Sequence, residues 1–180
     1  MEFKYCNESR VVRTCRVFPN DMNNHHTLFG GRLMSDLDQV ASISAARHSR
    51  SDCVTASIDS IDFLYPVKAT DSVSFESYVT CTGTSSMEVF VKIIAEGLKS
   101  GERKIAATAF LTFVALDEFK QPISVPKVIP QTKEELRLHQ TSLERKKIRK
   151  ERQEKSKDLA AFLTIDNAWD LIRLGQLTNL

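Results

Sequence analysis

The sequence has no long apolar run and almost no net charge. No apolar stretch approaches the roughly 20 residues that a membrane-spanning helix requires, and the first ten residues lack the hydrophobic core of a signal peptide. We therefore expect a cytoplasmic protein that does not enter a membrane. The 25 Lys and Arg residues nearly balance the 23 Asp and Glu residues, for a net charge of +2. This balance gives no reason to expect nucleic acid as a partner.

Cysteine is also scarce, and its four positions form no motif. Cys6, Cys15, Cys53 and Cys81 are spread over the chain without a CxxC pair. Such spacing favours neither a zinc site nor a disulfide framework. We expect reduced thiols and no bound metal.

The longest well-patterned segment is a helix in the first third of the chain, within the stretch Asn23–Ser49. Leu33, Leu37 and Val40 recur at helical spacing, and small residues dominate the second half, so a sheet can approach this helix closely. Asp38 lies among these apolar residues, and we take it as the lone carboxylate of the buried helix. A buried carboxylate is costly unless it is hydrogen-bonded or used in chemistry. Cations at the basic C-terminal end of the helix complement the helix dipole, so we expect His48 to be an ordinary helix-end residue rather than a ligand.

Five segments alternate polar and apolar residues or are rich in β-branched residues, which predicts strands. They are Arg10–Phe18, Cys53–Tyr65, Ser72–Thr82, Met87–Ala95 and Lys104–Leu116. Tight turns between the last four imply antiparallel neighbours. Both faces of the last strand are largely apolar, so we expect both to be covered.

The composition changes after Pro130, so we divide the chain into a domain of residues 1–130 and an extension of residues 131–180. A charged helix is predicted from Thr132 to about Leu163. Eight basic and three acidic residues lie between Glu144 and Lys157. This run forms either a solvated helix face or a contact for an anionic group. Beyond it, Leu159–Leu174 is apolar enough to predict docking on the body or on another subunit.

The order of strand, loop, long helix, four strands and helical extension predicts an α+β fold. One antiparallel sheet that curls around the long helix accommodates every segment. This arrangement is the hotdog fold, which often pairs its sheets across a two-fold axis.

Within this frame, Asn23, a polar loop, the pair Gly30-Gly31 and Asp38 follow one another. This pattern resembles that of the hotdog acyl-CoA thioesterases related to brain acyl-CoA hydrolase. The segments TASIDSIDFLYPVKATDSV, TGTSSMEVFVKI and ATAFLTFVALDE resemble strands of the same family. The likeness extends from Arg10 to Lys157. His26 and Thr70 depart from it, since glycine is usual at both places.

The resemblance implies hydrolysis of acyl-CoA to fatty acid and CoA, without a metal or cofactor. By this resemblance Asp38 is a general base or a nucleophile, Asn23 orients the water or the thioester across a subunit interface, and the amides at Gly30 and Gly31 polarise the carbonyl. Thr55 or Ser57, which period-two counting places on one face, could add a polar contact. The family also implies a homo-oligomer of dimers, expected to be a hexamer, with acyl-CoA as its small-molecule partner.

Other interpretations of the same residues remain open. The two glycines could serve a tight turn or close packing, Asn23 could cap its loop, and Asp38 could be a satisfied buried group. His25 or His26 could act as the base of a hotdog dehydratase, although the dehydratase motif is absent. A non-catalytic acyl-CoA sensor would need an effector module, for which the nine residues before the first strand leave no room. A scaffold role through the charged helix and the apolar end is a further alternative.

Overall fold

A computed structural model describes residues 2–165 of the chain. Contacts divide the chain into two units, Met1–Ser142 and Leu143–Leu180. The first unit holds the whole sheet and the long helix. The second unit contains most of one charged helix.

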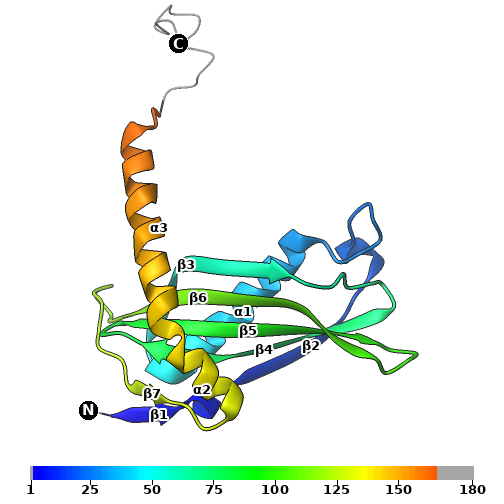
Figure 1. The fold of residues 1–180 in the computed structure, drawn as a ribbon, viewed down its shortest axis with the longest axis horizontal. Helices are drawn as coiled ribbons and strands as arrows, with labels where there is room; N and C mark the ends of the chain where they lie inside the picture. Colours follow the sequence, from blue (N-terminus) through cyan, green and yellow to red (C-terminus); the bar gives the residue numbers. More distant parts are fainter. Residues whose placement is uncertain (1, 166–180) are drawn as a thin grey trace, which may run out of the picture. The chain divides into compact units, whose positions relative to one another are not determined.

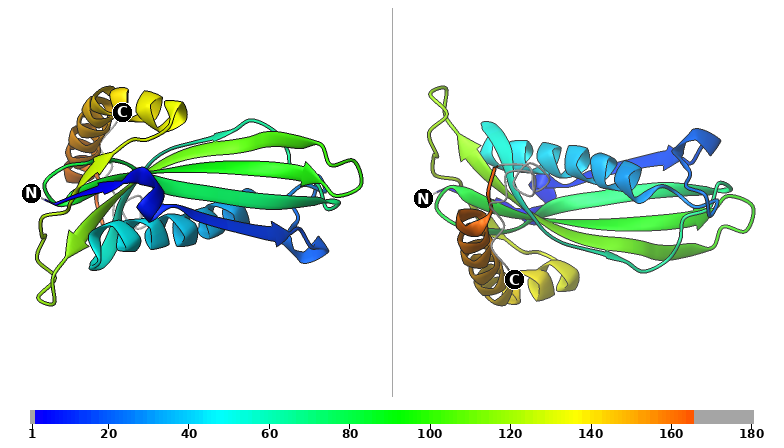
Figure 2. Two further views of the ribbon diagram at one scale, coloured as in Figure 1. Left: turned by 90° about the horizontal axis from the view of Figure 1, so that it is seen from below. Right: turned by 90° about the horizontal axis from the view of Figure 1, so that it is seen from above.

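The first unit is built on a five-stranded antiparallel sheet with the order β2-β4-β5-β6-β3 (Figure 1). Its strands are β2 (Val11–Arg16), β3 (Asp52–Phe63), β4 (Asp71–Thr82), β5 (Ser86–Gly97) and β6 (Arg103–Leu116). The long helix α1 (Gly30–Ser49) runs along one face of this sheet, as the two views of Figure 2 show. The predicted α+β hotdog architecture and the order of its main elements are confirmed.

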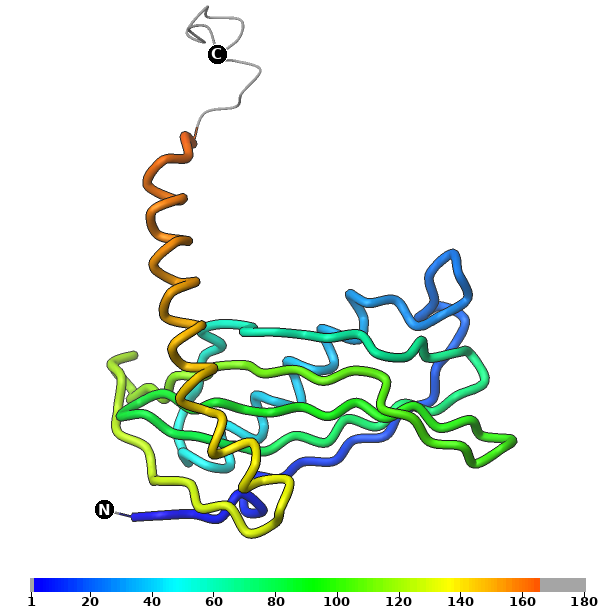
Figure 3. Tube along the Cα trace, in the orientation of Figure 1, coloured from blue at the N-terminus to red at the C-terminus, as the bar shows by residue number. Residues whose placement is uncertain are grey.

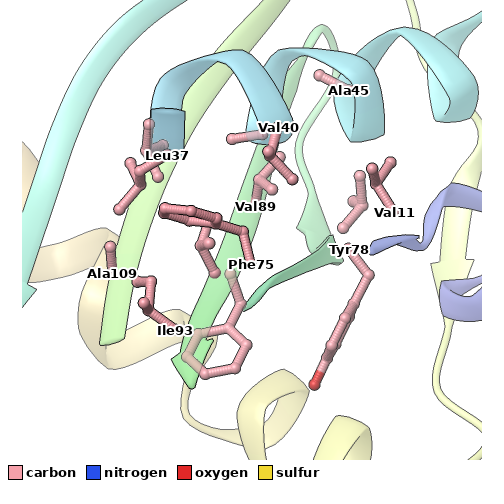
Figure 4. Packing of buried hydrophobic residues seen from close by; sticks show 14 of the residues in the cluster. Val11, Leu37, Val40, Ala45, Phe75, Tyr78, Val89, Ile93 and Ala109 are labelled. Atoms are coloured by element: carbon pink, nitrogen blue, oxygen red, sulfur yellow. The ribbon is translucent and has the colours of Figure 1, made fainter. Parts of the chain in front are cut away.

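The core lies between α1 and the sheet. Leu37, Val40 and Ala45 project from α1 toward Phe75 and Val89 on the sheet (Figure 4), and all five are fully buried. Burying one large apolar side chain of this kind contributes roughly 1.5–3 kcal/mol. The helix also forms a polar contact with the sheet, because the Ser44 and Ser77 hydroxyls lie 2.6 Å apart. Small residues on α1 therefore allow both packing and direct hydrogen bonding to the sheet.

The two faces of the sheet are covered unequally across its width. In β6, the consecutive residues Leu111, Thr112 and Phe113 are all buried, which confirms that both faces of this strand are covered there. In contrast, β3 lies at the edge of the sheet and pairs with β6 alone among the described strands. Val54, Ile58 and Phe63 of β3 are large apolar side chains that remain exposed. An edge with unpaired backbone groups and apolar side chains is suited to pairing with another chain.

Several short elements were not predicted. Strands β1 (Phe3–Tyr5) and β7 (Lys127–Ile129) form a small parallel sheet, and 3₁₀-helices lie at Cys6–Ser9 and Pro19–Asp21. The charged segment forms two helices rather than one continuous helix, α2 (Lys133–Gln140) and α3 (Ser142–Phe162).

Helix α2 belongs to the first unit, so the division of the chain falls after Ser142 rather than at residue 130. Thr132 caps this helix by accepting a hydrogen bond from the Glu135 amide at 3.2 Å. The Glu135 carboxylate is buried and forms an ion pair with Arg10, which also pairs with Glu76 of the sheet. The Tyr78 hydroxyl donates to Glu134 at 2.7 Å. These contacts attach α2 to the outer face of β4.

Helix α3 carries exposed apolar side chains, including Leu143, Ile148, Leu159 and Phe162. The predicted docking segment, Leu159–Leu174, lies largely outside the described residues, and its docking stays a prediction. No helix within residues 2–165 is both long and apolar enough to cross a bilayer.

Three connections meet at one end of the sheet (Figure 3). They are the loop before α1, the β3–β4 connection and the β5–β6 turn. The loop and the β3–β4 connection are joined by a backbone hydrogen bond of 2.8 Å from the Leu28 amide to the Val67 carbonyl. Thr27 and Lys68 form an isolated antiparallel bridge beside it. This end of the sheet therefore holds the residues before α1 in a fixed position.

Candidate active site

The N-terminus of α1 has free amide groups. Its N-cap residue, Phe29, provides no side-chain hydrogen bond, and the first turn contains no acidic residue. The first intrahelical bond runs from the Leu33 amide to the Phe29 carbonyl at 3.1 Å. Within residues 2–165, the amides of Gly30 and Gly31 have no acceptor. The positive end of the helix dipole is thus neither capped nor neutralised, and it can bind an oxygen that carries negative charge.

The two glycines are not required by the backbone conformation. Neither one has a positive φ angle. A Cβ atom on Gly30 would lie 3.6 Å from Cζ of Phe63, an ordinary van der Waals contact. A Cβ atom on Gly31 would lie 2.5 Å from the ring of Phe29, so close packing accounts for this glycine. For Gly30 neither the turn nor the packing demands glycine, and its missing side chain leaves the amide accessible.

Asn23 organises the loop that leads to this helix. Its Oδ1 accepts hydrogen bonds from the amides of His25 at 2.9 Å and Thr27 at 3.2 Å, and its Nδ2 donates to Oγ1 of Thr27 at 3.0 Å. The loop-capping role is therefore present. A side-chain amide has two N–H donors, and one acceptor is found for them within the described chain. The second donor leaves Asn23 able to bind a further oxygen.

A pocket of about 400 Å³ joins Asn23 to the start of α1. Gly30 and Leu33 form its helix side, and the other side includes Phe63, the last residue of β3, and Val67 in the connection that follows. Most of the lining is apolar, with the polar groups gathered at the Asn23 loop. A pocket of this kind can hold an apolar chain while presenting donors to one oxygen atom.

Asp38 lies elsewhere on the helix and contacts β3. The Thr55 hydroxyl donates to Oδ1 of Asp38 at 2.9 Å. Asp38 is half-buried, and the helical rise of about 1.5 Å per residue places it about 12 Å along the axis from Gly30. It does not line the pocket at Gly30. Within one chain, the Asn23 loop and the start of α1 are therefore separate from the Asp38–Thr55 pair beside the exposed edge strand.

The expectation that Thr55 and Ser57 share a face is wrong. Thr55 pairs with Phe113 of β6, whereas Ser57 pairs with Thr112, because a β-bulge shifts the register between them. Successive residues of β6 point to opposite faces, so their partners do too. Thr55 faces α1 and reaches Asp38, and Ser57 points to the other side of the sheet.

Asp38 is also not the lone carboxylate of the helix. Asp36 is the more buried of the two, and it forms ion pairs with Arg13 at 3.2 Å and Arg32 at 3.1 Å. Arg32 reaches Asp21 at 3.8 Å, next to the Asn23 loop. The Arg32–Asp36 spacing of four residues was a detectable sequence signal, but the contact from Arg13 required the fold. Asp36 is neutralised by cations, whereas Asp38 pairs with a hydroxyl alone among the residues that the structure describes.

The histidines give no support to the dehydratase alternative. His25 and His26 are exposed, and neither imidazole contacts a carboxylate within residues 2–165. His48 is fully buried and its Nε2 lies 2.9 Å from the Pro126 carbonyl oxygen. Burial lowers the pKa of His48, which disfavours the charged form of its imidazole. No group of three potential metal ligands occurs in the described part of the chain.

The chain is similar to known thioester hydrolases in both sequence and structure. Residues 25–102 match the Thioesterase superfamily. The chain is 59% identical to the acyl-CoA thioester hydrolase YkhA of Bacillus subtilis, over 93% of this chain and 98% of that protein. An acyl-CoA hydrolase from Staphylococcus aureus, solved with butyryl-CoA and CoA, is 41% identical, with a TM-score of 0.86 over 89% of this chain and 98% of that one. A hexameric acyl-CoA thioesterase is 42% identical, with a TM-score of 0.83 over 85% and 98% of the two chains.

The Staphylococcus aureus hydrolase has also been solved as three single-residue variants. An aspartate, a threonine and an asparagine are each replaced by alanine in them. The three replaced positions follow one another at the same intervals as Asn23, Asp38 and Thr55 in this sequence. The Asp38–Thr55 contact and the Asn23 loop are therefore the two places in this chain that correspond to those positions.

Proposed function

The chain is an acyl-CoA thioester hydrolase and belongs to the thioesterase superfamily, and from that premise we propose that Asp38 is its catalytic carboxylate, with Asn23 and the start of α1 holding the thioester. The hydrogen bond from Thr55 to Asp38 carries this proposal, because it gives a half-buried carboxylate a fixed orientation. The matching intervals in the Staphylococcus aureus variants support the same assignment.

The thioester oxygen binds at the uncapped start of α1. As water or a carboxylate adds to the carbonyl carbon, negative charge develops on that oxygen. The amides of Gly30 and Gly31 can stabilise this charge, since they have no acceptor of their own in the described chain. One oxyanion donor contributes about 3–4 kcal/mol to transition-state stabilisation. Asn23, through its second N–H group, holds the attacking water or the thioester.

Asp38 provides the attack on the carbonyl carbon by one of two routes. As a general base it takes a proton from water, and the hydroxide adds to the thioester. As a nucleophile it adds directly, and water then hydrolyses the resulting anhydride. On either route the C–S bond breaks, a proton reaches the CoA thiolate, and a free fatty acid is released. A carboxylate, amide donors and water suffice, so we propose that the reaction requires no metal or cofactor.

Each active site is composed of residues from two chains. The amides at Gly30 and the carboxylate of Asp38 lie too far apart along α1 to act on one carbonyl, since they are about 12 Å apart along the axis. Asp38 lies beside β3, whose exposed edge and apolar side chains suit antiparallel pairing with a second copy. In such a dimer, Asp38 of one protomer faces the helix start of its partner. The hexameric relative supports a trimer of these dimers.

We also propose that the protein works in the cytoplasm, in fatty acid metabolism. The four cysteines are free, which suits a reducing compartment. Fatty acid and CoA are the products that the proposed reaction would release.

Substitution of Asp38 tests the proposed function. Asp38→Asn keeps the size of the side chain and can still accept from Thr55, but it removes the basic and nucleophilic carboxylate. We expect turnover of acyl-CoA, followed by release of free thiol, to fall by about two orders of magnitude or more. Glu118→Gln is the matched control, since Glu118 is an exposed carboxylate on the loop after β6. Near-normal turnover in a correctly assembled Asp38→Asn protein would refute the assignment.

A further inference from the structure

A second pocket, of about 240 Å³, lies beside the first. It is formed by the β3–β4 connection and the β5–β6 turn, and Tyr65 lines both pockets. The bridge between Thr27 and Lys68 ties this second pocket to the Asn23 loop. The two pockets are therefore neighbours at the same end of the sheet.

Three lysines line this second pocket, Lys68, Lys99 and Lys104, and we refer to it as the lysine pocket. The ammonium group of Lys104 lies 3.0 Å from Glu102 and donates to the Tyr65 hydroxyl at 3.4 Å. In contrast, the ammonium groups of Lys68 and Lys99 have no partner within residues 2–165. Two cations of the pocket are thus free to bind a ligand.

Both carboxylates of the lysine pocket are already engaged. Asp71 is buried, and it accepts hydrogen bonds from the Lys68 amide at 2.8 Å and the Thr70 hydroxyl at 3.5 Å. Glu102 is paired with Lys104. Neither carboxylate neutralises the ammonium group of Lys68 or Lys99, so the pocket retains an excess of positive charge. Thr70 and Ser100 also line its wall.

We propose that the lysine pocket binds the phosphate groups of the CoA moiety, with Lys68 and Lys99 as their principal contacts. This inference rests on the proposed function, in which the thioester lies at Gly30. The CoA chain then leaves the first pocket past Tyr65, the residue that both pockets share. Lysine ammonium groups form charge-assisted hydrogen bonds with phosphate oxygens, whereas the apolar first pocket offers no cation for them.

The test compares substrates with and without phosphates. The Lys68→Ala, Lys99→Ala double variant is assayed with an acyl-CoA and with the corresponding acyl-pantetheine, which lacks every phosphate. We expect KM for acyl-CoA to rise about tenfold or more, with kcat and the kinetics on acyl-pantetheine unchanged. Lys133→Ala is the matched control, because it removes an exposed lysine from α2 without touching either pocket. An unchanged KM for acyl-CoA in the double variant would overturn the proposal.

Binding of adenosine 3′,5′-bisphosphate tests whether the lysine pocket binds the CoA moiety of the substrate or a separate effector. We expect it to bind the unaltered protein, to compete with acyl-CoA, and to bind the double variant at least about tenfold more weakly. Binding without competition would indicate a separate anion site and overturn the assignment to CoA. If the unaltered protein hydrolysed no acyl-CoA, the proposed function would fail, and bisphosphate binding would still decide whether the lysines form an anion site.

Discussion

Replacing Gly30 with alanine separates the functional role of this residue from its structural role. The added Cβ atom would lie 3.6 and 3.9 Å from ring atoms of Phe63, which are ordinary contacts. Gly30 has no positive φ angle that alanine would strain. Alanine also loses less conformational entropy than glycine on entering a helix, a gain of up to about 0.5–1 kcal/mol. The fold should therefore tolerate the change or become slightly more stable.

The effect of the same substitution on catalysis should be large. An oxyanion must lie about 2.7–3.1 Å from its amide donors, and the new methyl group occupies the pocket next to the Gly30 amide. Obstructing one such donor should lower kcat by about 10²-fold, within the range seen when an oxyanion donor is removed. The expected result is a variant of equal or higher melting temperature that hydrolyses acyl-CoA poorly.

Two measurements decide the outcome. Thermal unfolding reports stability, and free-thiol release at saturating acyl-CoA reports kcat. Size-exclusion chromatography confirms that the variant assembles as the unaltered protein does. Full activity in a stable variant would refute the oxyanion assignment at Gly30. Parallel loss of stability and activity would show instead that the fold requires glycine here.

Two further predictions concern single side chains. Thr55→Val should lower kcat about tenfold with little change in KM, because the Asp38 carboxylate loses its hydrogen-bond donor. Thr55→Ser keeps a hydroxyl and should retain most of the activity. Equal rates for the valine and serine variants would argue against this positioning role. Burial lowers the pKa of His48 below 6.5, so the imidazole of His48 binds a proton more readily in the unfolded chain than in the folded protein. The free energy of unfolding should therefore fall as the pH drops below 6.5. Urea unfolding between about pH 5 and 8 should show a smaller decline for His48→Gln, and an identical decline in both proteins would exclude His48 as its source.

The main elements of the fold were predictable because their signals are local. Most of the strands alternate and are followed closely by glycine or proline, and α1 carries a continuous apolar stripe, so the structure confirms each of these elements. The pair β1 and β7 was missed because three residues show no periodicity. The break at Thr141 between α2 and α3 was missed because neither glycine nor proline marks it.

Within the candidate site, the sequence-based predictions were wrong where the outcome depends on contacts between residues far apart in the chain. Period-two counting placed Thr55 and Ser57 on one face, but a bulge in β3 adds one residue between them. Asp36 appeared unremarkable in sequence, because one of its two cations, Arg13, comes from β2. Asp38 was expected to be the lone carboxylate of the helix, and Asp36 shows that this is wrong. The contact of Asp38 with Thr55 could not be predicted until the register of β3 with β6 was known.

The composite active site is tested most directly by mixing two inactive proteins. Asn23→Ala and Asp38→Ala remove residues that we assign to opposite protomers of one site. After dissociation and reassembly, a mixed dimer contains one site that lacks both residues and one site that retains both. Hydrolysis of acyl-CoA should therefore recover in the mixture, toward half of the unaltered rate in each mixed dimer. Absence of recovery in oligomers shown to be mixed would contradict the account and place Asn23 and Asp38 in the same protomer's site.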